Sequence, residues 1–132
     1  MRVADLMQPD VKTIDPDATI ADVVVSFADA HISALPVVDR AGRMLGVVSN
    51  TDVISVEAEA EERDRRELLH GTAVRDIMTP RTLTIAPEAD VRDAAREMLY
   101  AEVHRLFVEE DGELVGVIST TDIVRAVATG KI

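Results

Sequence analysis

The chain has 132 residues and no cysteine, and its 25 acidic and 14 basic residues give it a formal net charge of −11. Without cysteine there are no disulfides, no thiolate catalysis and no cysteine-based zinc site. The negative charge argues against a nucleic-acid binder and against binding to an anionic membrane, because such phosphate surfaces attract Lys and Arg. The N-terminus lacks a signal-peptide core, and no apolar run approaches membrane-spanning length. We therefore expect a cytoplasmic protein.

The sequence contains one internal repeat. Residues 3–9, V-A-D-L-M-Q-P, align with residues 74–80, V-R-D-I-M-T-P. Later in each copy, G-V-V-S-N-T-D ending at Asp52 aligns with G-V-I-S-T-T-D ending at Asp122. Two copies of one supersecondary unit are too few for a solenoid. They predict two units that close on each other about a pseudo-two-fold axis.

Each copy predicts the element order β-α-β-β-α. Thr19 in the first copy and Asp90 in the second stand at helix N-caps, and apolar residues follow both at helical spacing. Residues 35–38 and 44–48 flank the turn D-R-A-G and predict a β-hairpin, which the second copy repeats around residues 110–112. Each predicted sheet is too small to bury its apolar face alone.

A charged segment, residues 57–67, connects the copies. It contains three Glu-to-Arg pairs at a spacing of four residues: Glu59–Arg63, Glu61–Arg65 and Glu62–Arg66. Such pairs favour a solvated extension of the preceding helix over an interaction tail, and Gly71 ends that helix. We expect the first repeat with this helical linker to cover residues 1–70 and the second to cover residues 71–132.

The duplicated motif Gly-Φ-Φ-Ser-x-Thr-Asp, where Φ is aliphatic, has two interpretations. In the first, Ser49 or Ser119 caps a helix and Asp52 or Asp122 completes a capping box. In the second, the site binds a ligand: the glycine leaves room beside the backbone, and the helix N-terminus suits a phosphate. The carboxylate also suits a vicinal diol, as acidic residues do for ribose in dinucleotide folds. One carboxylate has two oxygens, so both interpretations can hold.

Taken in order over nearly the whole chain, these motifs resemble a tandem pair of CBS (cystathionine-β-synthase) domains, often called a Bateman module. The resemblance implies an α+β fold of two pseudo-symmetric β-α-β-β-α CBS repeats packed through their small sheets. It also implies two clefts between the repeats that take AMP, ADP, ATP, S-adenosylmethionine or NAD-like ligands. No cofactor is required under this interpretation.

The resemblance further implies two unequal ligand sites. Residues of the first are Ser49, Thr51, Asp52, Thr72, Ile77, His104 and Arg105. Residues of the second are Leu6, Ser33, Ala34, Ser119, Thr121 and Asp122. His104 and Arg105 match a phosphate-facing segment of the family, so we expect AMP or ADP to fill the first site before the second. No metal site is expected, because the three histidines have no ligand spacing.

We therefore predict a non-catalytic regulatory module that binds an adenine-containing ligand. Enzymatic activity is not expected, because the chain has no plausible nucleophile–base pair: its histidines are scattered and its motif serines stand at helix caps. Two alternatives remain open, a ligand-free structural dimerisation module and a regulatory subunit that docks on an enzyme or transporter. By resemblance we also expect a homodimer, formed through the apolar faces of the helices that start near Thr19 and Asp90.

Overall fold

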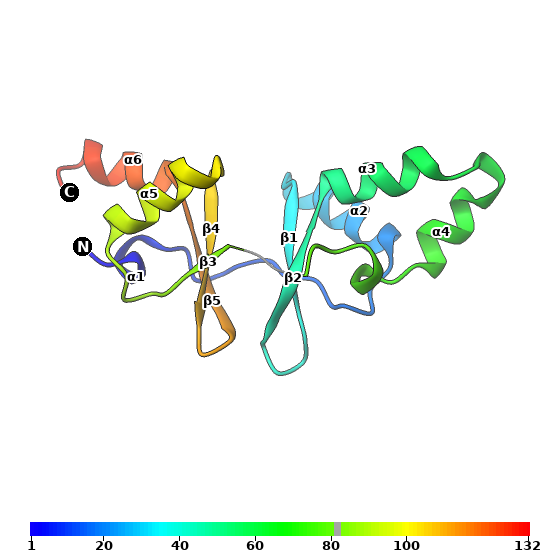
Figure 1. The fold of residues 1–132 in the computed structure, drawn as a ribbon, viewed down its shortest axis with the longest axis horizontal. Coiled ribbons are helices and arrows are strands. Elements are labelled where there is room, and N and C mark those ends of the chain that lie inside the picture. Colours follow the sequence, from blue (N-terminus) through cyan, green and yellow to red (C-terminus); the bar gives the residue numbers. More distant parts are fainter. Residues whose placement is uncertain (81–82) are drawn as a thin grey trace. The chain divides into compact units, whose positions relative to one another are not determined.

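A computed structural model describes residues 1–80 and 83–132, which form two compact units. Unit 1 consists of Met1–Val11 and Leu83–Ile132, and unit 2 of the described residues within Lys12–Thr82. Each unit has one small sheet with helices on one side of it (Figure 1). The mixed helix and strand content confirms the predicted α+β class.

Unit 1 is built on a three-stranded sheet. Strand β4 (Arg105–Glu110) lies between β3 (Thr84–Ile85), its parallel partner, and β5 (Glu113–Ser119), its antiparallel partner. Helices α5 (Val91–Ala101) and α6 (Thr120–Ala128) lie beside this sheet, with the short α1 (Val3–Leu6) next to α6 (Figure 1). The buried core between sheet and helices comprises Val3, Ile85, Ala94, Met98, Leu106, Val108 and Ile118.

Unit 2 is built on the hairpin of β1 (Ala34–Val38) and β2 (Met44–Ser49), which confirms the predicted hairpin. Its other elements are α2 (Ile20–Ala30), α3 (Asn50–Glu59), the 3-10 turn η1 (Glu62–Asp64), α4 (Arg65–Gly71) and the 3-10 turn η2 (Val74–Asp76). The buried core comprises Ile14, Val23, Leu35, Val37, Val48 and Val74.

The first strand predicted for each copy is very short. In unit 2 it is a single parallel bridge between Ile14 and Val37, and in unit 1 it is the two-residue β3. The reason lies two residues beyond Ile14 and Ile85, where Pro16 and Pro87 stand. Proline has no N–H to donate to the next rung of a parallel ladder, so the strand ends there.

The compact units do not coincide with the sequence repeats, because each copy's opening segment lies in the other unit. The Val3 N–H donates to the Ala89 carbonyl at 2.8 Å, which ties the chain's start to unit 1. The Val74 N–H donates to the Ala18 carbonyl at 2.8 Å, which ties the start of the second copy to unit 2. The boundary between residues 70 and 71 stays a prediction about the repeats.

The predicted single helix through the charged segment is wrong. Helix α3 ends at Glu59, and Ala60 is extended (ψ 137°), so the chain turns back into η1 and α4. Arg65 then forms an ion pair with Glu57 at 2.7 Å rather than with Glu61. Leu68 and Leu69 of α4 line a small apolar space against α2 and α3. The continuous helix is lost because these two leucines pack back on the unit.

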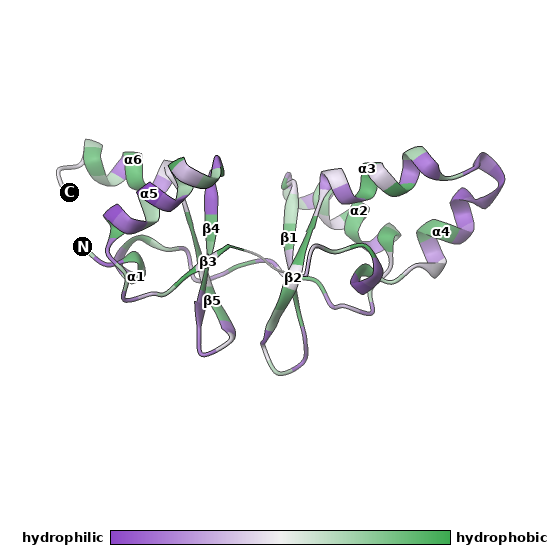
Figure 2. Ribbon diagram, viewed as in Figure 1, coloured by the Kyte–Doolittle hydropathy of each residue, from purple (hydrophilic) through white to green (hydrophobic). Residues whose placement is uncertain are grey.

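Figure 2 shows the strands of both sheets mainly in hydrophobic colours and the α3–α4 connection in hydrophilic ones. Among the helices of residues 1–80 and 83–132, none combines the length and apolar character needed to cross a membrane.

Candidate ligand-binding site

The two copies of the Gly-Φ-Φ-Ser-x-Thr-Asp motif each end in a helix N-terminus. Ser49 caps α3 and Ser119 caps α6. The backbone N–H of each serine donates to Oδ2 of the aspartate three residues later, at 2.8 Å for Asp52 and 2.9 Å for Asp122. Each aspartate N–H in turn donates to the serine hydroxyl. The predicted capping boxes are therefore present in both units.

The motif threonines follow the caps on the exposed side of each helix start. Thr51 and Thr121 are both exposed, so their hydroxyls face solvent. The backbone carbonyl of Thr51 accepts a hydrogen bond from the Ser55 hydroxyl at 2.8 Å. Each helix N-terminus thus presents a carboxylate and an exposed hydroxyl together, a set that suits a ribose phosphate. Among the described residues, the N–H groups of the first and third residues of each helix already have acceptors, which leaves the N–H of the motif threonine for a ligand.

The motif glycines make room for the protein's own backbone. The Val47 N–H donates to the Thr79 carbonyl at 3.0 Å, and a Cβ on Gly46 would collide with that carbonyl oxygen. In unit 1, a Cβ on Gly116 would lie 2.7 Å from the Met7 sulfur and 3.0 Å from the Gln8 carbonyl oxygen. The space predicted beside each glycine is therefore filled by the methionine that ends the V-x-D-Φ-M motif and by the residue after it.

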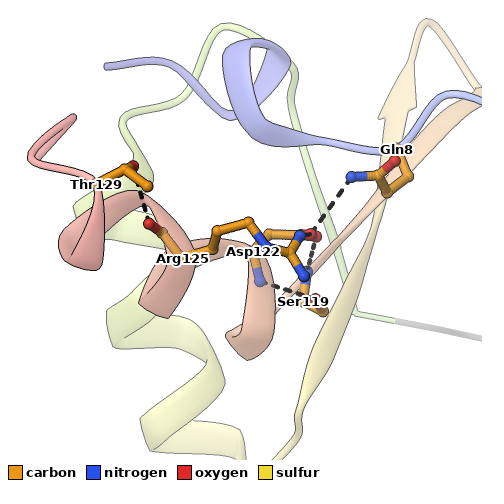
Figure 3. A network of polar contacts seen from close by, with 5 residues as sticks. All are labelled: Gln8, Ser119, Asp122, Arg125 and Thr129. Atoms are coloured by element: carbon orange, nitrogen blue, oxygen red, sulfur yellow. Dashed lines mark hydrogen bonds and ion pairs between the residues drawn. The ribbon is translucent and has the colours of Figure 1, made fainter.

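The two carboxylates differ in their surroundings. Asp122 is buried, with 9% of its side chain exposed, whereas Asp52 is half-buried. Oδ1 of Asp122 faces Nε2 of Gln8 at 3.4 Å and Nη1 of Arg125 at 3.8 Å (Figure 3). Within residues 1–80 and 83–132, no hydrogen bond or ion pair reaches Oδ1 of Asp52. Oδ1 of Asp52 is thus available as an acceptor, whereas Oδ1 of Asp122 already has two partners.

Leu6 and Asp122, which the sequence assigned to the second site, come together within unit 1. They line a cavity of 260 Å³ whose other residues are Asp5, Met7, Gln8, Arg125, Ala126, Thr129 and Lys131. Leu6 is half-buried and packs against the unit 1 core. The cavity therefore has an apolar wall and a rim with both acidic and basic side chains.

Thr72 and Ile77, which the sequence assigned to the first site, lie in unit 2 together with Asp52. Thr72 is the C-cap of α4, and its carbonyl accepts a hydrogen bond from the Ile20 N–H at 3.3 Å. It lines an open cavity of 620 Å³ whose rim includes Glu59, Glu61, Asp64 and Glu67. Ile77 is half-buried against the unit 2 core.

His104 and Arg105 are exposed and lie in unit 1. The His104 carbonyl accepts a hydrogen bond from the Thr120 N–H at 2.9 Å, and Arg105 pairs with Ser119 in the β4–β5 ladder. Their side chains are therefore presented at the end of the sheet where α6 begins. Their predicted combination with Ser49 and Asp52 of unit 2 stays a prediction.

Ser33 and Ala34 hold the matching positions in unit 2. The Ser33 carbonyl accepts a hydrogen bond from the Asn50 N–H at 2.9 Å, and Ala34 pairs with Ser49. Neither side chain carries charge. The predicted difference in charge between these two segments is thus present at equivalent places on the two sheets.

The sequence interpretation missed Gln8 and Arg125, the two residues that contact Asp122. Gln8 follows the V-x-D-Φ-M segment, and nothing in that segment signals an approach to Asp122 far along the chain. Arg125 stands three residues after Asp122, a helical spacing at which an ion pair could have been foreseen. Across the described part of the chain, no group of three or more His, Asp and Glu side chains is arranged to hold a metal ion.

Comparison with known proteins identifies relatives along the whole chain. An inosine-5′-monophosphate dehydrogenase of Bifidobacterium longum is 31% identical over 121 residues, which cover 90% of this chain and 21% of that enzyme. The CBS domain-containing protein CBSX2 of Arabidopsis thaliana is 26% identical over 94% of this chain and 62% of its own length. The chain thus spans about a fifth of the first relative and under two thirds of the second.

A crystal structure of CBSX2 in complex with AMP has the same fold. It superposes with a TM-score of 0.83 and 29% identity, covering 99% of this chain and 98% of that one. The family model for the CBS domain matches twice, at residues 3–59 and 74–129, and so accounts for most of the sequence. The chain therefore belongs to the CBS domain family, as a tandem pair of CBS domains.

Proposed function

We propose that this chain is a non-catalytic regulatory module that binds an adenine nucleotide, with AMP as the first candidate. The observation that carries the proposal is the geometry of Asp52. Its Oδ2 completes the cap of α3 at 2.8 Å, and its Oδ1 remains available to accept hydrogen bonds from a vicinal diol. A carboxylate also holds the ribose hydroxyl in dinucleotide folds.

The surroundings of Asp52 support the same ligand class. The N-terminus of α3 adds a positive dipole end and the Thr51 N–H, which has no acceptor among the described residues, and both favour a phosphate. Thr72 and Ile77, in the same unit, are a polar and an apolar candidate for contact with an adenine ring. The AMP complex of CBSX2, a relative that aligns over nearly all of this chain, supports AMP above other adenosine derivatives.

We further propose the site residues that the family resemblance assigned. For the first site these are Ser49, Thr51, Asp52, Thr72 and Ile77 of unit 2, with His104 and Arg105 of unit 1 as phosphate contacts. For the second they are Leu6, Ser119, Thr121 and Asp122 of unit 1, with Ser33 and Ala34 of unit 2. An S-adenosylmethionine-like ligand is the second candidate, and it suits the second site because Ser33 and Ala34 offer a phosphate no cation.

The test compares Asp52→Ala with Asp22→Ala by isothermal titration of AMP. Asp22 completes the capping box of α2 with Thr19 but lies outside the duplicated motif. Both variants lose a capping partner, so each should lose about 1 kcal/mol of unfolding free energy. Only Asp52→Ala should weaken AMP binding, by about tenfold or more, because a hydrogen bond to a charged group is worth about 1.5–3 kcal/mol.

Two results would decide against this proposal. Equal AMP affinity in Asp52→Ala and Asp22→Ala would leave Asp52 with a capping role alone. A wild-type protein whose melting temperature moves with none of AMP, ADP, ATP, S-adenosylmethionine or NAD would support the ligand-free structural module. A ligand present at about 100 times its dissociation constant should add roughly 2.7 kcal/mol of stability, so the shift is measurable.

We also propose that two copies of the chain associate through exposed helix faces. The predicted apolar faces of α2 and α5 are not available, because Val23, Ala94 and Met98 lie in the buried cores of the units. Several large apolar side chains on other helix faces are exposed: Val25 on α2 at 58%, Leu99 on α5 at 80%, Tyr100 on α5 at 93% and Val124 on α6 at 65%. Side chains from α5 and α6 also line a mainly apolar groove of 470 Å³. Exposed apolar patches of this kind mark interaction sites, and a second copy offers the same self-complementary surface.

A further inference from the structure

Asp122 and Asp52 hold equivalent places in the two units but not equivalent hydrogen bonds. Both use Oδ2 for the capping box. Oδ1 of Asp122 additionally meets the side-chain amide of Gln8 at 3.4 Å and the guanidinium of Arg125 at 3.8 Å. In Figure 3 the Gln8 side chain reaches from the N-terminal segment toward Asp122 on α6. Gln8, Asp122 and Arg125 also line one cavity.

The Gln8 contact with Asp122 has no counterpart at Asp52 in the part of the chain that the structure describes. Thr79 takes the place of Gln8 in unit 2, and its backbone makes the same bridge: Gln8 pairs with Val117, and Thr79 with Val47. The backbones therefore run alike, while the short threonine side chain makes no hydrogen bond with Asp52 among the described residues. Ser55 takes the place of Arg125, and its hydroxyl donates to the Thr51 carbonyl instead.

We infer that Gln8, supported by Arg125, determines which of the two carboxylates accepts a ribose diol. The inference rests on the proposed function, since it assigns a preference between the two proposed sites. A diol that donates to Oδ1 of Asp122 must first displace the Gln8 amide and share the oxygen with Arg125. At Asp52 no described side chain has to move. The ligand should therefore bind at Asp52 first.

The effect should be moderate. The Gln8–Asp122 hydrogen bond is long, Gln8 is exposed, and the Arg125 side chain is 67% exposed, so water screens both contacts. Exposed pairs of this kind contribute little each, and a displaced amide regains hydrogen bonds to water. We expect the two contacts to lower affinity at Asp122 by about threefold to tenfold.

The experiment exchanges the side chains of Gln8 and Thr79, which hold equivalent positions in the two units. Gln8→Thr gives unit 1 the side chain of unit 2, and Thr79→Gln does the reverse; both are titrated with AMP by calorimetry. Asp52→Ala isolates the Asp122 site, and Asp122→Ala isolates the Asp52 site. In the Asp52→Ala background, Gln8→Thr removes one of the two contacts and should raise AMP affinity about twofold to threefold. In the Asp122→Ala background, Thr79→Gln should lower the affinity for AMP. The affinity for 2′-deoxy-AMP, which lacks the diol, should not respond to either exchange.

Structural damage is separable from the predicted effect. Both exchanges keep the backbone N–H and carbonyl of the bridge and install a residue that the other unit already holds there. Thermal melting of the unliganded variants checks that they fold. AMP affinities that depend on Asp52 and Asp122 but do not respond to either exchange would overturn this inference alone. A wild-type chain that binds no AMP would overturn both the inference and the proposed function.

Discussion

Replacing Gly46 by alanine tests how the segment after the V-x-D-Φ-M motif is held against the hairpin. A Cβ at position 46 would collide with the Thr79 carbonyl oxygen, a backbone atom, and would lie 3.0 Å from the Met78 sulfur. Thr79 is fixed there by two backbone hydrogen bonds with Val47, of 3.0 and 2.8 Å. Relief of the collision therefore requires these bonds to stretch.

The magnitude follows from three contributions. Overpacking of a close contact costs about 1–3 kcal/mol, and two weakened backbone hydrogen bonds cost about 1 kcal/mol each. The smaller conformational entropy of unfolded alanine returns about 0.4–1 kcal/mol. We expect Gly46→Ala to lower the free energy of unfolding of unit 2 by about 2–4.5 kcal/mol.

Urea denaturation measures this loss as a lower midpoint at an unchanged slope. Gly116→Ala is the graded comparison, because its nearest obstacle is the flexible Met7 side chain at 2.7 Å, so it should lose about 1–2 kcal/mol. Gly71→Ala is the control: it has an ordinary φ and nothing within 4 Å of the added Cβ, and it should be neutral or slightly stabilising. A Gly46→Ala protein as stable as wild type, or more stable than Gly116→Ala, would refute the reasoning.

Two further predictions concern the outer helices. Leu99→Glu places a charge on the exposed face of α5, so sedimentation should find a dimer for the wild type and a monomer for the variant; a dimer in both would contradict the proposed interface. The Arg92 backbone N–H donates to Asp90 at 2.8 Å and lowers the pKa of that carboxyl below its ordinary value of 3.8. The folded state therefore binds the Asp90 proton less tightly than the unfolded state. The stabilising contribution of Asp90 is present above pH 3.8 and declines as the pH falls through the folded pKa. The stability difference between wild type and Asp90→Asn should therefore shrink in that pH range. A stability difference that does not depend on pH would contradict this assignment.

Local sequence signals were sufficient for the helix caps, the hairpins and the family. Ser49 and Ser119 each start a helix with the acid expected three residues later, because a capping box depends only on neighbours in the chain. Thr19 also stands at the predicted N-cap. The turn residues likewise placed the β1–β2 hairpin. The tandem pair is recognisable from the sequence because these local signals recur in the same order in both copies.

Tertiary contacts decided the rest, because they join residues that are distant in sequence. The charged segment satisfied local rules for one helix, yet Leu68 and Leu69 turn it back onto unit 2. The motif glycines suggested space for a ligand, and the segment carrying Thr79 fills that space beside Gly46. The difference between the two carboxylates is of the same kind. Asp52 and Asp122 stand in nearly identical motifs, and only the fold brings Gln8 across the chain to occupy one of them.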